Sequence, residues 1–280
     1  MEYQPIIERA AHVIAGADAL LIGAGAGMGV DSGMPDFRGA IGFWKAYPLF
    51  KGKTFSQVAN PRLFLEDPEQ AWGFYGHRLN LYRNTVPHRG YEIISAWTRS
   101  KIRDYFVFTS NVDGHFQKAK FDEDKIVECH GSINYLQCST SCGSTGIWSA
   151  DQTVVEVDEL RIRATSKLPT CPECGSIARP NILMFGDFAW NPRRSARQED
   201  RYEKWYLRVK SKNVVAIEFG AGIAIPTVRY ECQRRGKMLI RVNPRDYHAP
   251  DDAISIPLNA LEALVAIDEV MGKQVESCPS

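Results

Sequence analysis

The sequence predicts an α/β protein in which helices cover both faces of a parallel sheet, with a smaller domain inserted into the chain. Three observations support this prediction. Short apolar runs alternate with helix-like stretches, glycines follow the first apolar run, and two pairs of cysteines stand in a more polar segment. With 280 residues, 44% of them hydrophobic, the chain can bury a large core, and this length suits one large domain with a smaller appendage.

The expected strands are short and apolar, as is typical of parallel strands that are buried on both faces. They are residues 19–22, 105–109, 126–128, 214–219 and 238–242. Because helix-like stretches separate most of these runs, we expect a doubly wound, Rossmann-like parallel sheet.

The expected helices carry apolar residues on one side. In the last of them, Leu258, Leu261 and Leu264 recur at helical spacing. The predicted helices are residues 5–15, 68–83, 89–99, 194–209 and 257–271.

Two segments interrupt the alternation of strands and helices. Residues 40–88 are aromatic and helix-like without a strand, and residues 133–180 hold the paired cysteines among polar residues. We interpret 40–88 as a helical module and 133–180 as a zinc-ribbon insertion, which together form the smaller domain. The Rossmann-like domain then consists of residues 1–39, 89–132 and 181–280.

The paired cysteines have the spacing of two metal-binding knuckles. Cys138 and Cys142 are separated from Cys171 and Cys174 by 28 residues, and a glycine follows the second cysteine of each pair. Four thiolates fill the coordination of a tetrahedral Zn²⁺ ion, so the predicted role of the metal is structural. Free or disulfide-bonded cysteines are the alternative, which the paired spacing disfavours. The free thiols are then Cys129, Cys232 and Cys278.

The glycines Gly25 and Gly27 follow the first apolar run directly. At this place in an α/β sheet, backbone N–H groups can approach a pyrophosphate, and a side chain would hold the backbone away. The segment continues to Pro35, Asp36, Phe37, Arg38 and Gly39, which places an acid, an aromatic ring and a guanidinium on one loop. We interpret the whole stretch as a cofactor site with a hinged lid.

Polar residues follow two further strands. Asn111 and Asp113 come after the second expected strand, and His130 comes after the third. The carboxyl ends of parallel strands face the crevice in which such folds bind ligands. Since imidazole titrates near neutral pH, His130 is the candidate general base.

These motifs resemble those of the sirtuin family, in the same order and at similar spacing over residues 5–270. The resemblance rests on the following segments: Gly25-Ala26-Gly27, Gly33-Met34-Pro35-Asp36-Phe37-Arg38-Gly39, Thr109-Ser110-Asn111-Val112-Asp113, Cys129-His130-Gly131-Ser132, Phe185-Gly186-Asp187 and Val242-Asn243. It implies an NAD-dependent protein-lysine deacylase that consumes NAD and releases nicotinamide, deacylated lysine and O-acyl-ADP-ribose. An acylated protein or peptide is the implied partner.

The resemblance also implies roles for single residues. His130 activates a ribose hydroxyl, and Asn111 orders ribose and water. Ala26 and the neighbouring amides hold the pyrophosphate, while Phe37 shields the reactive carbon. The implied cofactor-binding residues are Gly25, Ala26, Gly27, Asp36, Phe37, Arg38, Ser110, Asn111, Asp113, Gly220, Ala221, Gly222 and Asn243, and the implied substrate loop contains Phe185 and Gly186.

The chain departs from the family pattern at several polar positions. A serine of the family is replaced by Gly29, and a glutamine that contacts the nicotinamide ribose is replaced by Ser110. Gly-Thr-Ser becomes Gly220-Ala221-Gly222, and Phe-Gly-Glu ends in Asp187. These departures keep two alternatives open: an NAD glycohydrolase or mono-ADP-ribosyltransferase that uses the same site, and a non-enzymatic NAD sensor, against which His130 and Asn111 argue.

Tyr75 and Arg78 bear on the choice of acyl group. Members of the family that prefer malonyl- or succinyl-lysine carry a similar Tyr-x-x-Arg, and residues at i and i+3 of a helix share one face. Since guanidinium binds carboxylate bidentately, the pair can hold an acidic acyl group. Ordinary packing of an aromatic helix is the alternative.

Charge and hydropathy indicate which classes of binding partner are not expected. A net charge of +1 gives no general basic excess for nucleic acid or membrane surfaces, and we interpret Arg193, Arg194, Arg197 and Arg201 as the solvent-facing side of a helix. No secretory pattern opens the chain, and residues 13–28 are too rich in glycine for a membrane span. We therefore expect a soluble, cytoplasmic protein.

Overall fold

The computed structural model describes residues 3–35, 45, 47–100, 102, 104–140, 142–143 and 146–276. Its central element is a six-stranded parallel sheet with the strand order β11-β10-β9-β1-β2-β3. The strands are β1 (Ala19–Ala24), β2 (Tyr105–Thr109), β3 (Ile126–Glu128), β9 (Val214–Phe219), β10 (Met238–Val242) and β11 (Ile254–Ile256). This is the order of a Rossmann sheet, with the chain reversing its direction of progress beside β1, so the predicted fold class is confirmed.

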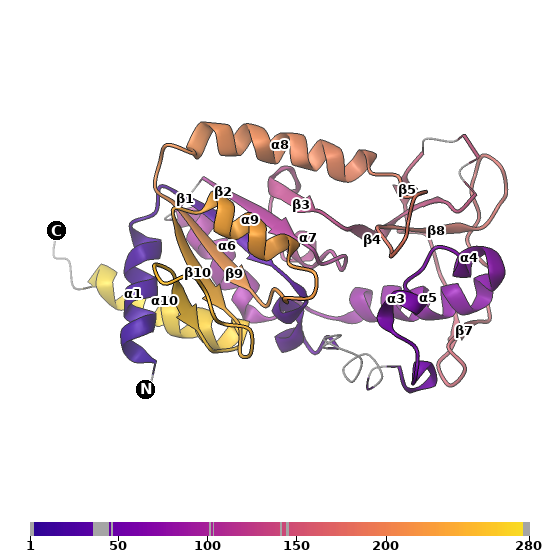
Figure 1. Cartoon of the computed structure of the whole chain (residues 1–280), viewed down its shortest axis with the longest axis horizontal. Coiled ribbons are helices and arrows are strands. Elements are labelled where there is room, and N and C mark those ends of the chain that lie inside the picture. The colour runs from indigo at the N-terminus through magenta and orange to yellow at the C-terminus, as the bar shows by residue number, and fades with distance from the viewer. Residues whose placement is uncertain are drawn as a thin grey trace.

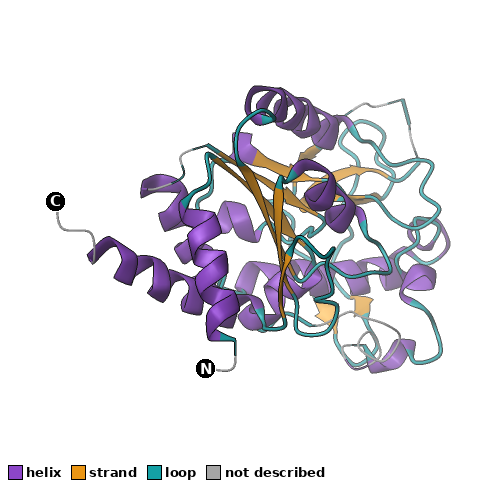
Figure 2. Cartoon of the chain, turned by 60° about the vertical axis from the view of Figure 1, so that its left-hand side comes forward, coloured by secondary structure: helices purple, strands orange, loops and turns teal. Residues whose placement is uncertain are grey.

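Helices cover both faces of this sheet (Figure 2). They are α1 (Gln4–Ala15), α6 (Arg89–Ser100), α8 (Arg193–Val209), α9 (Thr227–Arg235) and α10 (Ala260–Glu276). Leu20 and Ile22 of β1 pack on the side of α1, α6 and α10, whereas Leu21 packs on the side of α8 and α9. Successive residues of a strand point to opposite faces, which explains why β1 is buried along its whole length.

All five predicted strands and all five predicted helices are present, and some of them begin or end at other residues than predicted. The last helix begins at Ala260 and reaches Glu276, later at both ends than predicted. Strand β11 and helix α9 were not predicted. The three residues of β11 are too few for a pattern, and α9 buries only one narrow strip around Val228 and Cys232.

The second part of the molecule combines helices with short antiparallel strands, at the right of Figure 1. Its helix α5 (Pro68–Asn84) lies against the hairpin of residues 157–164 so closely that a Cβ at Gly73 would be 2.1 Å from the Ile162 carbonyl oxygen. The remaining elements are α3 (Phe55–Val58), α4 (Leu63–Glu66), β4 (Gly131–Cys138), β5 (Trp148–Ser149), β6 (Val157–Asp158), β7 (Arg163–Ala164) and β8 (Ala178–Ile182), with α7 (His115–Lys118) and the 3₁₀ helices η1 (Ala26–Ser32), η2 (Pro48–Phe50) and η3 (Glu123–Lys125) in loops.

One apolar cluster joins the helices and the antiparallel strands of this second part of the molecule. Trp72, Phe74 and Leu79 of α5 belong to it together with Leu136 of β4 and Ile182 of β8. Along the described chain, none of the helices combines the length and the apolar character needed to cross a membrane.

Candidate active site and metal centre

The glycine loop joins β1 to η1 and packs against the loop after β9. Gly25 N–H donates to the Phe219 carbonyl at 2.9 Å, and Gly27 N–H donates to the Gly220 carbonyl at 3.0 Å. A Cβ at Gly25 would lie 2.5 Å from Ala221 Cα, so glycine is required there by the neighbouring loop. Among the described residues, no acceptor takes the N–H of the exposed Ala26, which leaves it free for a phosphate oxygen.

Asn111 is fixed above this loop by the end of β2. Thr109 Oγ1 donates to the Ala24 carbonyl at 2.9 Å and accepts from Asn111 N–H at 3.0 Å. Asn111 Nδ2 then donates to the Gly25 carbonyl at 3.0 Å, while Ser110 N–H donates to the Ala24 carbonyl at 3.1 Å. The structure therefore brings Asn111 and Ser110 to the glycine loop. The bridging role of Thr109 was not predicted.

His130 follows the edge strand β3 and enters β4. Its carbonyl accepts from Leu183 N–H at 2.9 Å, and the next residue, Gly131, has a φ of 79°. A Cβ at Gly131 would be 2.0 Å from the Asn181 carbonyl oxygen, so the turn that places His130 requires glycine. Burial lowers the pKa of His130, opposed in part by a hydrogen bond to the Ser110 backbone. The imidazole is therefore neutral at neutral pH, as a general base must be.

Helix α8 holds the strand that leads to His130. Ser195 Oγ donates to the Glu128 carbonyl at 2.9 Å, and Gln198 Oε1 accepts from Glu128 N–H at 3.0 Å. Arg194 pairs with the Glu128 carboxylate and lies 4.1 Å from the ring centre of Tyr135. The interpretation of this basic stretch as solvent-facing is wrong for Arg194, because its guanidinium pairs with the buried Glu128 carboxylate, which would otherwise be an uncompensated interior charge.

Asp113 lies between α7 and the glycine-loop helix. Its Oδ1 accepts from His115 N–H at 2.9 Å, and its Oδ2 would be 4.0 Å from a Cβ at Gly29. The Asp113 carboxylate thus lies beside η1. The predicted lid residues Asp36, Phe37 and Arg38 lie outside the described residues.

The loops after β9 and β10 complete this edge of the sheet. Gly220, with a φ of 58°, donates its N–H to the Val242 carbonyl at 2.9 Å. Asn243 is fully buried, and its Nδ2 donates to the Ala221 carbonyl at 3.0 Å. Gly222 follows in the same loop, half-buried. The structure thus gathers the loops that follow β1, β2, β9 and β10 at one edge of the sheet.

The segment around Phe185 lies against Phe55 and Ala59. Phe185 N–H donates to the Ala59 carbonyl at 3.1 Å, and its ring meets Phe55 edge-on at 5.9 Å. Gly186 has a φ of 66°, which favours glycine. Asp187 forms a buried bidentate pair with Arg179 at 2.7 and 2.8 Å. Its carboxylate therefore anchors the loop.

Tyr75 and Arg78 are both buried on α5. The Arg78 guanidinium donates to the Tyr82 hydroxyl from Nε at 2.9 Å and from Nη2 at 2.5 Å. Its Cζ lies 5.8 Å from the Tyr75 ring centre and 5.4 Å from that of Phe74. Burial raises the pKa of Tyr75, and Arg78 opposes that rise. A buried cation thus stands among aromatic rings and phenol groups.

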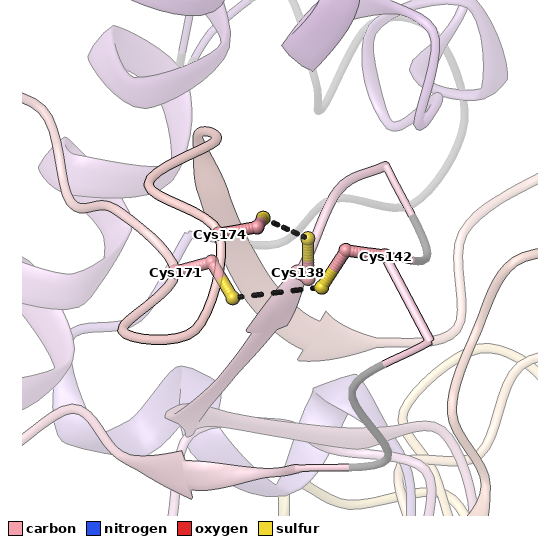
Figure 3. Close-up of side chains that lie close together, drawn as sticks. All are labelled: Cys138, Cys142, Cys171 and Cys174. Carbon is pink, nitrogen blue, oxygen red and sulfur yellow. Dashed lines mark hydrogen bonds between the residues drawn. The ribbon is translucent and has the colours of Figure 1, made fainter.

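The four predicted metal ligands converge at the end of β4 (Figure 3). Their ligand atoms all lie within 4.8 Å of one another, with Cys138 Sγ 3.7 Å from Cys174 Sγ and Cys142 Sγ 3.9 Å from Cys171 Sγ. Four sulfurs bound to tetrahedral Zn²⁺ at 2.3 Å are about 3.8 Å apart. Burial alone would raise the pKa of Cys138, but hydrogen bonds to Thr140 and Cys142 lower it to about 6. The cluster fits one structural zinc ion. Cys129 and Cys232 are buried thiols outside it, and Cys278 lies outside the described residues.

We expect one tightly held zinc ion per chain, and we expect Cys171→Ser to lose it. Since metal binding supplies folding free energy to such a site, the variant and the chelated protein should both melt at a lower temperature. Elemental analysis and thermal unfolding check this, with the exposed Glu173→Gln in the same knuckle as the control. Metal-free protein after purification in zinc-containing buffer would contradict the prediction.

Acid should destabilise the protein from pH 6.5 downward. Burial lowers the folded-state pKa of four histidines, His77, His88, His115 and His130. Below about pH 6.5 the unfolded chain takes up protons at these sites before the folded chain does, so the free energy of unfolding falls with pH. Urea titrations at pH 7.5 and pH 5.5 measure it, and equal midpoints would contradict the prediction.

The model of the Sir2 family matches residues 25–204. An "NAD-dependent protein deacylase" of Thermococcus kodakarensis is 28% identical over 240 residues, which cover 85% of this chain and 84% of that protein. The "NAD-dependent protein deacylase 1" of Archaeoglobus fulgidus is 25% identical over 239 residues, covering 85% and 86%.

Solved structures show the same fold. A Sir2 homologue in complex with ADP-ribose superposes with a TM-score of 0.73 at 23% identity, covering 98% of this chain and 99% of the other. A complex of a Sir2 homologue with NAD gives a TM-score of 0.70 at 24% identity, covering 96% and 94%.

Proposed function

This chain belongs to the Sir2 family, and on that premise we propose that it is an NAD-dependent protein-lysine deacylase that consumes NAD. One observation carries the proposal: Asn111 binds the glycine loop, and His130 lies beside it at the same edge of the sheet, with a hydrogen bond to the Ser110 backbone. That edge is the place where open α/β sheets bind nucleotides.

The proposed reaction breaks the bond between nicotinamide and ribose and forms a bond from the acyl carbonyl oxygen to the ribose carbon. His130 then accepts a proton from a ribose hydroxyl, which takes over the acyl group, and the lysine amine leaves. Asn111, oriented by Gly25 and Thr109, positions the ribose and the water that completes the transfer. The products are nicotinamide, deacylated lysine and O-acyl-ADP-ribose.

In this proposal, each loop at the sheet edge binds a different part of NAD. Gly25 and Gly27 shape the pyrophosphate cradle, whose free donor is the Ala26 N–H. Ser110 and Asp113 face the nicotinamide side. The adenosine half lies against the loops after β9 and β10. The residues of these loops are Gly220, Ala221, Gly222 and Asn243, and the lid is assigned Asp36, Phe37 and Arg38.

Transfer of ADP-ribose to water or to a protein side chain is the second candidate. Gly29 and Ser110 favour it, because each offers less polar contact than the serine and glutamine of the resembling family, so the ribose is held by fewer groups. Nicotinamide release with and without an acyl-lysine peptide separates the two. Deacylation requires the peptide, whereas glycohydrolysis proceeds without it.

We propose further that the enzyme favours acidic acyl groups. The support is the buried Arg78 guanidinium, which stands beside Tyr75 and Tyr82 and within 5.9 Å of the Phe55 ring centre. Phe55 in turn contacts Phe185 of the substrate loop. A carboxylate that reaches this cluster gains a cationic partner in a region of low dielectric constant, where such a pair is strong.

A further inference from the structure

Three charged side chains meet in the interior next to the loops after β9 and β10. Glu218 of β9 is fully buried and faces Arg241, its register partner on β10. Arg241 Nε donates to Glu218 Oε1 at 2.9 Å, and Arg241 Nη2 donates to Oε2 at 3.0 Å. Arg229 approaches from α9, with Nη1 3.7 Å from Glu218 Oε1. Because desolvating charges is costly, such a cluster contributes little to core stability and calls for another role.

The other donors of the two guanidinium groups bind loop carbonyls. Arg229 Nη1 donates to the Asp246 carbonyl at 2.9 Å and to the Ala221 carbonyl at 3.2 Å. Arg229 Nη2 donates to the His248 carbonyl at 3.2 Å, and Arg241 Nη1 donates to the same oxygen at 2.6 Å. Arg229 therefore ties the loop after β9 to the loop after β10.

The tied loops are the ones that meet the glycine loop. The Ala221 carbonyl accepts from Asn243 Nδ2 as well as from Arg229. Asn243 Oδ1 accepts the N–H of Asp246 at 3.0 Å, and Ala221 Cα stands 2.5 Å from where a Cβ at Gly25 would be. A shift of either loop would therefore change the shape of the cradle around Gly25.

We propose that Arg229 is a positioning residue for NAD, and that Glu218 and Arg241 hold its guanidinium in place. The inference rests on the proposed function, since it assigns these loops to the adenosine half of NAD. Arg229 acts on affinity more than on the chemical step, because its own hydrogen bonds go to the loops after β9 and β10. His130 is held by the segment after β8, and Asn111 is held by Thr109 as well as by the glycine loop.

The test compares Arg229→Met with Arg234→Met, which removes an exposed arginine from the same helix. In Arg229→Met, Glu218 keeps Arg241 as its partner, so the variant should fold. We expect its KM for NAD to rise on the order of tenfold, because several hydrogen bonds from a charged donor are lost, while kcat and the KM for acyl-peptide stay within twofold. Arg229→Lys keeps the charge without the planar fork, so its KM should rise less. If Arg229→Met does not fold, the KM for NAD of Arg229→Lys tests the inference instead.

Calorimetric titration with ADP-ribose provides a readout that does not need turnover. Binding to Arg229→Met should weaken by the same factor as the KM for NAD rises, and Arg234→Met should bind as the unmodified protein does. Unchanged ADP-ribose affinity in a folded Arg229 variant overturns the inference, and so does an equal loss of kcat and of peptide affinity. If the unmodified protein binds ADP-ribose but turns over no acyl-peptide, the proposed function fails while this inference is still decided by the titration.

Discussion

Turnover of an acyl-lysine peptide should fall by about two to four orders of magnitude when His130 is replaced by alanine, because that is the usual contribution of a general base. The neutral imidazole is the one group at this edge of the sheet to which the proposal assigns the uptake of the ribose proton. Its lowered pKa keeps it in the base form at neutral pH. Initial rates at saturating NAD and peptide measure the loss.

His12→Ala is the matched control, since His12 is exposed on α1. It should leave the rate unchanged. ADP-ribose should still bind His130→Ala with an affinity close to that of the unmodified protein, which separates lost chemistry from lost folding. A His130→Ala rate within a few-fold of the parent would remove His130 from the proposed mechanism.

Exchanging Arg78 for methionine should reverse the acyl preference. The unmodified enzyme should process succinyl- or malonyl-peptide better than acetyl-peptide. Without the guanidinium, the acyl carboxylate would be buried unpaired, at a cost of about 2–5 kcal/mol, which changes the relative rates by at least tenfold. Methionine keeps much of the apolar packing against the Phe74 and Tyr82 rings.

The ratio of kcat/KM values for succinyl- and acetyl-peptide is the quantity to measure. Tyr75→Phe should lower the ratio less than Arg78→Met does, because the cation is retained, and the exposed Arg62→Met should leave it unchanged. If Arg78→Met slows both peptides equally, or if acetyl-peptide is the better substrate of the unmodified enzyme, then Tyr75 and Arg78 only pack the module.

The sheet could be predicted because its strands are buried on both faces and therefore appear as uninterrupted apolar runs. The residues that follow those runs could be predicted as site residues for the same reason, since parallel strands place their carboxyl ends at one edge. The cysteine spacing likewise predicted the metal centre. The fold and the sulfur cluster are confirmed, while the catalytic and cofactor roles stay predictions.

The partnerships that brace the site could not be predicted, because each joins residues far apart in the chain. Arg241 with Glu218, and Gln198 with Glu128, meet only once the sheet and α8 are in place. One signal was available: a glutamate within an apolar run, as at Glu218, indicates a buried partner, since a lone interior charge is too costly. Helix α9 was hard to predict because it buries few residues, among them Cys232. Cys232 packs against β1 only because Gly23 has no side chain there.

The most direct test of the account is to quantify the products formed from NAD and a succinyl-lysine peptide by the unmodified protein. Mass spectrometry should find nicotinamide, deacylated peptide and O-succinyl-ADP-ribose in equal amounts, and none of them without the peptide. Free ADP-ribose formed without loss of the acyl group would instead show transfer to water, and an unchanged NAD concentration would contradict the proposed function altogether.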